Sequence, residues 1–253
     1  MNFTERTACV IIPARYSSTR FPGKPLVPLL GKPMILWVAE LAVRAVGKMH
    51  VFIATDDAQI AEVVEGAGFS VLMTSSFAKT GTDRIAEAAS MIDYDIYINV
   101  QGDEPLVDPE DIVRCIELKA RHFDFVINGY CYINEQEDPT SVNLPKVITN
   151  ESSMMVYMSR SRLPGSKDPQ NAPLKYMKQV CIYGFSKGDL LAFTGFGRKS
   201  NLENFEDIEI LRFLELNRDV FMYKCKAGSL AVDVPEDVPL VESELLLRET
   251  DSK

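Results

Sequence analysis

Three basic residues follow the first apolar segment of the chain. Arg15, Arg20 and Lys24 lie in segment 13–26 (PARYSSTRFPGKPL), among small and hydroxylated residues and Gly23. Arg offers planar pairs of N–H donors and Lys a compact positive charge, and both bind phosphate oxygens. Small residues let backbone N–H groups approach an anion. The segment therefore predicts a loop that binds a triphosphate; the alternative is a solvated basic loop.

Two aspartates far apart in the sequence can add a metal ion to such a site. Asp103 follows the predicted strand 95–100, and Asp233 ends the extended segment 221–233. Mg²⁺ commonly takes one or two carboxylates together with phosphate oxygens. Each aspartate alone is more often a structural turn residue. Together with the basic loop, they favour a site in which carboxylates hold Mg²⁺ and cations hold the phosphates.

Other classes of site are disfavoured by what the sequence lacks. There is no G-x-x-x-x-G-K-[ST] motif, and no G-x-G-x-x-G follows a strand, which argues against a dinucleotide cofactor. His50 lies at the start of a predicted strand and His122 precedes another, whereas ligands of open parallel sheets bind beyond the carboxyl ends of the strands. A Ser-His-Asp hydrolase and a His-rich zinc site are therefore disfavoured. Phosphoryl or nucleotidyl transfer remains, because it works by positioning and charge stabilisation.

Composition sets the broad class of the protein. The 253 residues are 46% hydrophobic, enough to fill a core, and the net charge of −9 makes nucleic acid an unexpected partner. No run of about 20 apolar residues predicts a membrane span. The segment MNFTERTACVIIPAR lacks the features of a secretory signal, so we expect a cytoplasmic protein. Reduced thiols are expected at Cys9, Cys115, Cys131, Cys181 and Cys225.

The elements that must position these residues alternate in the first half. Short β-branched runs predict strands, and apolar residues at helical spacing predict helices. This alternation indicates βαβ units and a mostly parallel sheet. Strands are expected at 8–14, 50–55, 70–74 and 95–100, and helices at 34–46, 57–68, 82–92 and 109–120.

The second half is less regular and richer in strand signals. Segment 163–175 is rich in Pro, Gly and polar residues, and predicts a long loop or mobile arm. No linker separates two independent domains, which favours one domain with an embedded β-rich insertion. Strands are expected at 124–133, 146–150, 154–161 and 179–185, an extended segment at 221–233, and helices at 205–216 and 238–249.

Six short motifs occur in the same order as in the 3-deoxy-manno-octulosonate cytidylyltransferases, or CMP-Kdo synthetases. They are IIPARYSSTRFPGKPL, GKPM, ATDD, TGTDRIAEA, INVQGDEP and VDVPED, dense over 8–110 and sparser beyond. The chain resembles this family. The resemblance implies an α/β, GT-A-like nucleotidyltransferase fold: a mostly parallel central sheet, helices on both faces and a β-rich dimerisation insertion. It implies one domain over 1–253, with a nucleotide-binding part about 1–120 and a sugar-binding and dimerisation part about 121–235.

The resemblance also implies an activity and its residues. CTP and a 2-keto-3-deoxy sugar acid would give the CMP-sugar and pyrophosphate with Mg²⁺, in a homodimer that serves lipopolysaccharide biosynthesis. Matching motif positions assign catalysis to Arg15, Lys24 and Asp103, and Mg²⁺ to Asp103 and Asp233. They assign CTP binding to Arg15, Arg20, Lys24, Thr80, Thr82, Arg84 and Gln101. Sugar binding is assigned to Gln101, Arg160, Gln179, Tyr183, Glu209 and Arg212.

The expected sugar pocket departs from the family at three places. Lys178 and Gln179 replace an Arg-His pair, the segment 164–167 replaces Pro-Trp-Asp-Arg, and Arg212-Phe213 replaces Glu-Gln. We therefore expect a modified acid, such as 8-amino Kdo. The alternatives are another nucleotide, another acidic sugar such as a nonulosonic acid, a sugar phosphate, or a non-catalytic nucleotide-binding module.

Overall fold

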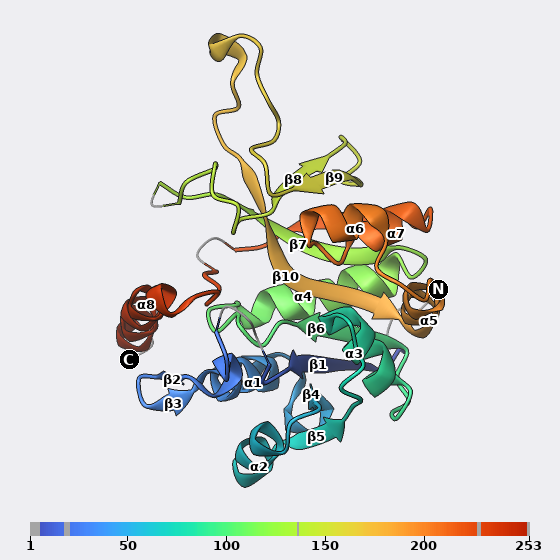
Figure 1. Ribbon diagram of the computed structural model, residues 1–253, viewed down its shortest axis with the longest axis vertical. Coiled ribbons are helices and arrows are strands. Elements are labelled where there is room, and N and C mark those ends of the chain that lie inside the picture. The colour runs from blue at the N-terminus through green and yellow to red at the C-terminus, as the bar shows by residue number, and fades with distance from the viewer. Residues whose placement is uncertain (1–5, 18–20, 136, 227–228, 252–253) are drawn as a thin grey trace.

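A mixed sheet forms the centre of the molecule. The computed structural model describes residues 6–17, 21–135, 137–226 and 229–251. Within these residues the main path of the sheet runs β11–β7–β10–β6–β1–β4–β5 (Figure 1). The bounds are β1 Ala8–Ala14, β4 Val51–Thr55, β5 Ser70–Met73, β6 Ile96–Val100, β7 Val126–Tyr132, β10 Met177–Ser186 and β11 Val220–Lys224.

Most neighbouring strands are parallel, as predicted. β1 pairs in parallel with β4 and β6, β4 with β5, and β11 with β7. β10 is antiparallel to both β6 and β7, and so it joins the two halves of the chain in one sheet. Among the smaller strands, β8 Lys146–Thr149 pairs with β10, and β9 Met155–Ser159 pairs with β8. The strands β2 Pro28–Leu29 and β3 Lys32–Pro33 form a separate hairpin.

Helices cover both faces of the sheet, which confirms that expectation. Alternate residues of β1 enter two different cores: Val10 and Ile12 pack with one set of helices, Cys9 and Ile11 with the other. The first set is α1 Met34–Val46, α2 Ala58–Gly66 and α4 Pro109–Arg121. The second is α3 Gly81–Ala89, α5 Lys187–Gly195, α6 Asn201–Glu206 and α7 Leu211–Glu215, and α8 Val238–Asp251 lies at the side near β2 (Figure 1).

An irregularity in β10 connects the sheet to the loop that follows β6. The register of β10 against β7 shifts between Val180 and Tyr183, a bulge that bends the strand. The Gln101 N–H donates to the Cys181 carbonyl over 3.2 Å. The Cys181 N–H donates to Glu104 Oε1 over 3.3 Å. The bulge thereby fixes both ends of the loop 101–104.

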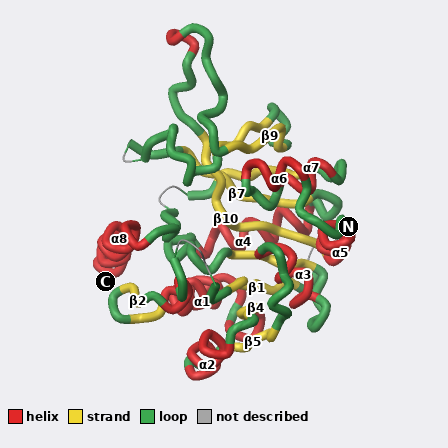
Figure 2. The backbone as a smooth tube through the Cα atoms, in the orientation of Figure 1, coloured by secondary structure: helices red, strands yellow, loops and turns green. Residues whose placement is uncertain are grey.

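Two features of the second half differ from expectation. The predicted helix 205–216 is two short helices, α6 and α7, because Asp207 between them has a left-handed φ of 50°. Helix α5 was not expected. The segment 221–233, expected to be extended, contains β11, which ends at Lys224, and its residues 227–228 lie outside the described residues. The expected loop 163–175 does project from the sheet, with one short 3₁₀ turn at Pro169–Asn171 (Figure 2).

The structure also bears on the expectations about a membrane span and about the cysteines. In the described ranges, no helix combines the length and apolarity needed to cross a bilayer. The five cysteines are all free thiols, and all but Cys181 are buried.

Candidate functional site

A cavity of about 590 Å³ opens where β1 and β6 end. Its wall includes Pro13 and Ala14 at the end of β1, and the loop 101–104 after β6. β1 and β6 are parallel, so their carboxyl ends share one edge of the sheet, where ligands of such folds bind. The volume is in the range of small-molecule sites.

Lys24, Asp103 and Asp233 meet at one end of this cavity. Lys24 Nζ lies 2.5 Å from Asp103 Oδ2 and 4.0 Å from Asp233 Oδ1. The Val232 N–H donates to the Asp103 carbonyl over 2.9 Å, which holds the two segments together. The two aspartates therefore come together in space as predicted, while their binding of a metal ion stays a prediction. Arg15 lines the same cavity, while Arg20 lies outside the described residues.

Two glycines allow the loops of this end to come close together. Gly23 has a φ of 70°, a backbone conformation that favours glycine, and it precedes Lys24. A Cβ on Gly102 would lie 3.0 Å from the Pro13 carbonyl oxygen and 3.1 Å from Ile35 Cδ1. The loop can therefore approach β1 only because residue 102 lacks a side chain.

The donor set at this end suits a magnesium ion that brings its remaining ligands from a nucleotide. The side chains of Asp103 and Asp233 are 24% and 27% exposed, and a compact cation, the Lys24 ammonium, lies within reach of both. Across the described ranges, no group of three or more His, Cys, Asp or Glu side chains forms a closed metal site. Mg²⁺ is usually held by one or two carboxylates plus phosphate oxygens and water.

The N-terminus of α3 forms a second wall of the cavity. Glu209 accepts hydrogen bonds from the N–H groups of Gly81 (2.9 Å) and Thr82 (2.8 Å), and from Thr82 Oγ1 (2.7 Å). Thr80, Gly81 and Glu209 line the cavity. Thr82, expected to bind CTP, is corrected: it is buried and its hydroxyl contacts Glu209 instead of the cavity.

Gln101 and Arg84 also belong to this wall. A Cβ on Gly81 would lie 2.9 Å from Gln101 Nε2, so the two residues are in close contact. Arg84 is buried, 3.1 Å from Asp56 Oδ1 and 2.5 Å from Thr74 Oγ1. These contacts tie α3 to the end of β4 and leave Arg84 beside the cavity.

Arg160, Gln179 and Tyr183, which are expected to bind a sugar, also line the cavity. Arg160 donates to the carbonyls of Glu206 (2.5 Å), Val142 (2.7 Å) and Asp207 (2.9 Å). Its guanidinium therefore joins two loops at the cavity rim. Burial raises the pKa of the Tyr183 phenol well above its usual range, so this residue presents a neutral surface to the cavity.

Part of the cavity lining is a polar network that the sequence did not predict. Glu104 Oε2 accepts a hydrogen bond from Ser229, and burial raises the pKa of this carboxyl. Lys178 Nζ pairs with Glu137 and donates to the Ser229 carbonyl. All four residues line the cavity. Glu104 could have been found from the sequence, because it follows Asp103 directly. Nothing in the sequence pointed to Ser229 or Glu137.

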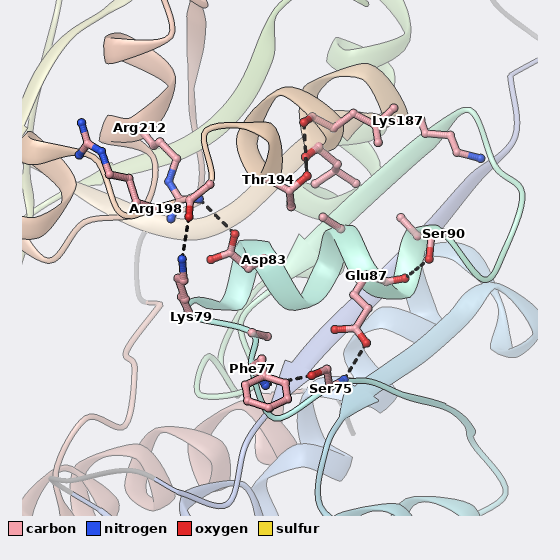
Figure 3. Close-up of a pocket in the computed structure, with 16 residues that line it drawn as sticks. Ser75, Phe77, Lys79, Asp83, Glu87, Ser90, Lys187, Thr194, Arg198 and Arg212 are labelled. Carbon is pink, nitrogen blue, oxygen red and sulfur yellow. Dashed lines mark hydrogen bonds and ion pairs between the residues drawn. The ribbon is translucent and has the colours of Figure 1, made fainter.

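Arg212 does not reach the cavity, which corrects its assignment to sugar binding. Its side chain is 1% exposed and makes two hydrogen bonds to Glu203, of 2.7 and 2.6 Å. It also lies 3.1 Å from Asp83 (Figure 3). The guanidinium lies over the Phe193 ring, 3.6 Å from its centroid. Arg212 thus joins α3, α5, α6 and α7, and Phe213 beside it is a core residue.

This chain is similar to known proteins in sequence and in fold. A family described as cytidylyltransferase matches residues 9–226. The 8-amino-3,8-dideoxy-manno-octulosonate cytidylyltransferase of Shewanella baltica (strain OS155) is 40% identical over 246 residues, covering 93% of this chain and 97% of that protein. A CMP:2-keto-3-deoxy-manno-octonic acid synthetase complexed with CTP is 32% identical, with a TM-score of 0.87 over 96% of this chain and 99% of its own.

A more distant likeness concerns the fold alone. The 4-diphosphocytidyl-2C-methyl-D-erythritol synthase of Anaerococcus prevotii DSM 20548 is 11% identical, with a TM-score of 0.65. It covers 95% of this chain and 96% of its own. The same α/β sheet therefore occurs at very low sequence identity.

Gly102→Ala is predicted to damage the site through its backbone. The added methyl would press on the Pro13 carbonyl, with a cost of about 1–3 kcal/mol for overpacking, and the loop that carries Asp103 would shift. We expect lower unfolding free energy in urea and at least about tenfold lower kcat/KM. Gly195→Ala is the control, because its Cβ would meet nothing within 4 Å. Equal behaviour of the two variants would refute the packing argument.

Arg212→Met is predicted to destabilise the fold. It leaves the Glu203 carboxylate buried without its cation, and breaking a buried pair typically costs about 3–5 kcal/mol. Glu40→Gln, which removes an exposed ion pair with Lys32, should cost less than about 1 kcal/mol. Urea unfolding of both variants provides the measurement. A loss below 1 kcal/mol for Arg212→Met would contradict a structural role.

Proposed function

Because this chain belongs to the cytidylyltransferase family, we propose that it transfers the CMP group of CTP to a 2-keto-3-deoxy sugar acid and releases pyrophosphate. The observation that carries the proposal is the meeting of Lys24, Asp103 and Asp233 at the strand-end cavity. A non-catalytic nucleotide-binding module would not need two carboxylates beside a phosphate-binding cation.

The reaction requires charge control more than a strong base. The anomeric hydroxyl of the sugar acid attacks the α-phosphorus of CTP, an O–P bond forms, and the bond to the β-phosphate oxygen breaks. The proton of the attacking hydroxyl passes to water or to the departing pyrophosphate. Negative charge grows on the leaving group, so fixed cations near the phosphates lower the barrier. In this proposal Arg15 and Lys24 supply those cations.

Asp103 and Asp233 are the residues that would hold Mg²⁺. Their carboxylates lie together and are partly exposed to the cavity, which supports this part of the proposal. When bound, the ion would neutralise phosphate oxygens and make the attacking hydroxyl more acidic. When CTP binds, Lys24 would exchange its contacts with the two carboxylates for contacts with phosphate oxygens. The same ammonium would thus neutralise negative charge both without and with the nucleotide.

We assign the remaining walls of the cavity to the cytidine of CTP and to the sugar acid. Thr80, Gly81, Arg84 and Gln101 form the wall at the start of α3, and we assign it to the cytidine. The wall with Arg160, Gln179 and Tyr183 is assigned to the sugar acid, and so is Glu209, which lies at the start of α3. Gln101 touches Gly81 and lies in the loop of Asp103, so it borders both ligands.

The proposed sugar is 8-amino-3,8-dideoxy-manno-octulosonate, with Kdo as the second candidate. The relative at 40% identity acts on the 8-amino sugar by its name, and the structure at 32% identity is named for the unmodified acid. Lys178 and Gln179 at the sugar wall differ from the Arg-His pair of Kdo enzymes. The proposal includes a role in lipopolysaccharide biosynthesis in the cytoplasm and a homodimer formed through the β-rich part.

Pyrophosphate release with CTP tests the proposed function. We expect turnover with the 8-amino sugar and weaker turnover with Kdo, and none with a nonulosonic acid or a sugar phosphate. ATP, GTP and UTP in place of CTP should give little product. A preference for Kdo would replace the 8-amino assignment, and no turnover with either octulosonate would refute the function.

Asp103→Asn and Asp233→Asn are predicted to lower kcat/KM at least about a hundredfold at saturating Mg²⁺, because each removes an anionic oxygen ligand. Both side chains are partly exposed, so folding should be retained. Asp93→Asn, on an exposed site, is the matched control. Chelation of divalent ions should abolish wild-type turnover; turnover that survives chelation would contradict the metal role.

A further inference from the structure

Asn128 is a buried amide beneath the sugar wall. It lies on β7 with no exposed surface, and its Nδ2 donates to the carbonyls of Val180 (3.0 Å) and Ile182 (2.9 Å). The bulge in β10 leaves both carbonyls available to this amide. A side-chain NH₂ has two hydrogens, and both are now used. The reverse orientation would place Oδ1 against two carbonyl oxygens, so the amide is fixed with Nδ2 toward Val180 and Ile182 and with the acceptor Oδ1 toward Gln179.

The orientation of Asn128 fixes the orientation of Gln179. Gln179 Nε2 donates to Asn128 Oδ1 over 3.0 Å. A flipped Gln179 would place two acceptor oxygens against each other. The Gln179 main chain is also held, because its N–H donates to the Pro145 carbonyl over 2.9 Å.

Gln179 lines the cavity, and Asn128 lies behind it. With one Nε2 hydrogen engaged by Asn128, the amide keeps its carbonyl oxygen Oε1 as its acceptor and one further Nε2–H. Among the described residues, no group donates a hydrogen bond to this oxygen. It is therefore an acceptor that is available to a ligand and cannot become a donor.

We propose that Asn128 is a positioning residue that makes Gln179 a fixed hydrogen-bond acceptor, and that Gln179 Oε1 receives a hydrogen bond from an ammonium or hydroxyl group of the sugar acid. This inference rests on the proposed function. At Oε1 itself, an acceptor of fixed orientation repels the sugar carboxylate and favours groups that donate. An ammonium group only donates, so it suits this position, whereas an Arg or Lys here would repel it.

The neighbouring charge does not oppose an ammonium group. Lys178 precedes Gln179, but its own ammonium is paired with Glu137 and donates to the Ser229 carbonyl. Its positive charge is therefore compensated within the wall. Near Gln179 the sugar would therefore meet the Oε1 oxygen of Gln179 and an ion pair, Lys178–Glu137, without net charge.

Gln179→Leu and Asn128→Ala, alone and combined, test the proposal with the 8-amino sugar, Kdo and 8-deoxy Kdo as substrates. We expect Gln179→Leu to raise the sugar KM at least about tenfold, as for a lost hydrogen bond, with CTP KM changed less than about twofold. A loss for the 8-amino sugar and Kdo that is absent for 8-deoxy Kdo assigns the contact to the C8 group. An equal loss for all three assigns it to a ring or chain hydroxyl.

The double variant separates positioning from general structural support. If Asn128 acts through Gln179, Asn128→Ala should raise the sugar KM in the wild-type background but by less than about twofold in the Gln179→Leu background. Additive effects, or an unchanged sugar KM in Gln179→Leu, would overturn the inference. Gln59→Leu on the exposed face of α2 is the control.

A conservative replacement provides a test that does not depend on the folding of Asn128→Ala. In Gln179→His, one ring N–H can donate to Asn128 Oδ1 and leave the other nitrogen as an acceptor. This variant should retain a sugar KM closer to wild type than Gln179→Leu does; equal losses would count against the acceptor role. A wild-type protein without turnover on any 2-keto-3-deoxy acid would instead refute the proposed function, and the inference with it.

Discussion

The loop that follows β6 is the part of the molecule on which the site depends. Its backbone bonds to β10 at Cys181 and to Val232, and Gly102 lies against the end of β1. Three distant segments therefore determine where Asp103 lies. Two carboxylates near each other would repel, and the Lys24 ammonium between them offsets that repulsion until a ligand brings its own charges. The sheet, the loop 101–104 and Lys24 together thus fix the position of Asp103.

Much of this end of the site could be predicted from the sequence, for physical reasons. Parallel strands place their carboxyl ends at one edge, so the loops after 8–14 and 95–100 had to be neighbours. Asp103 and Lys24 follow from that rule and from their residue types. The approach of Asp233 was predicted from the further idea that a magnesium site gathers carboxylates, and Asp233 does lie 4.0 Å from Lys24 Nζ. The strand and helix pattern of the first half followed from hydrophobic periodicity.

The errors share a different cause: a residue type does not say which way its side chain turns. Arg212 carries a charge that a substrate could use, yet Glu203 and Asp83 bind it in the interior. Thr82 lies in a motif beside the cavity but turns toward Glu209. The break between α6 and α7 depends on one left-handed residue, Asp207, inside an otherwise helical hydrophobic pattern. Such features depend on contacts between segments far apart in the chain.

The position of β10 in the sheet has a consequence for synthesis on the ribosome. β6 is complete at Val100, but the strand that pairs with its outer edge is Met177–Ser186. An emerging chain therefore carries an open strand edge while many further residues are translated, and open edges are sites of wrong pairing between chains. The first half of the chain therefore keeps this edge of β6 open until residues 177–186 are available to pair with it.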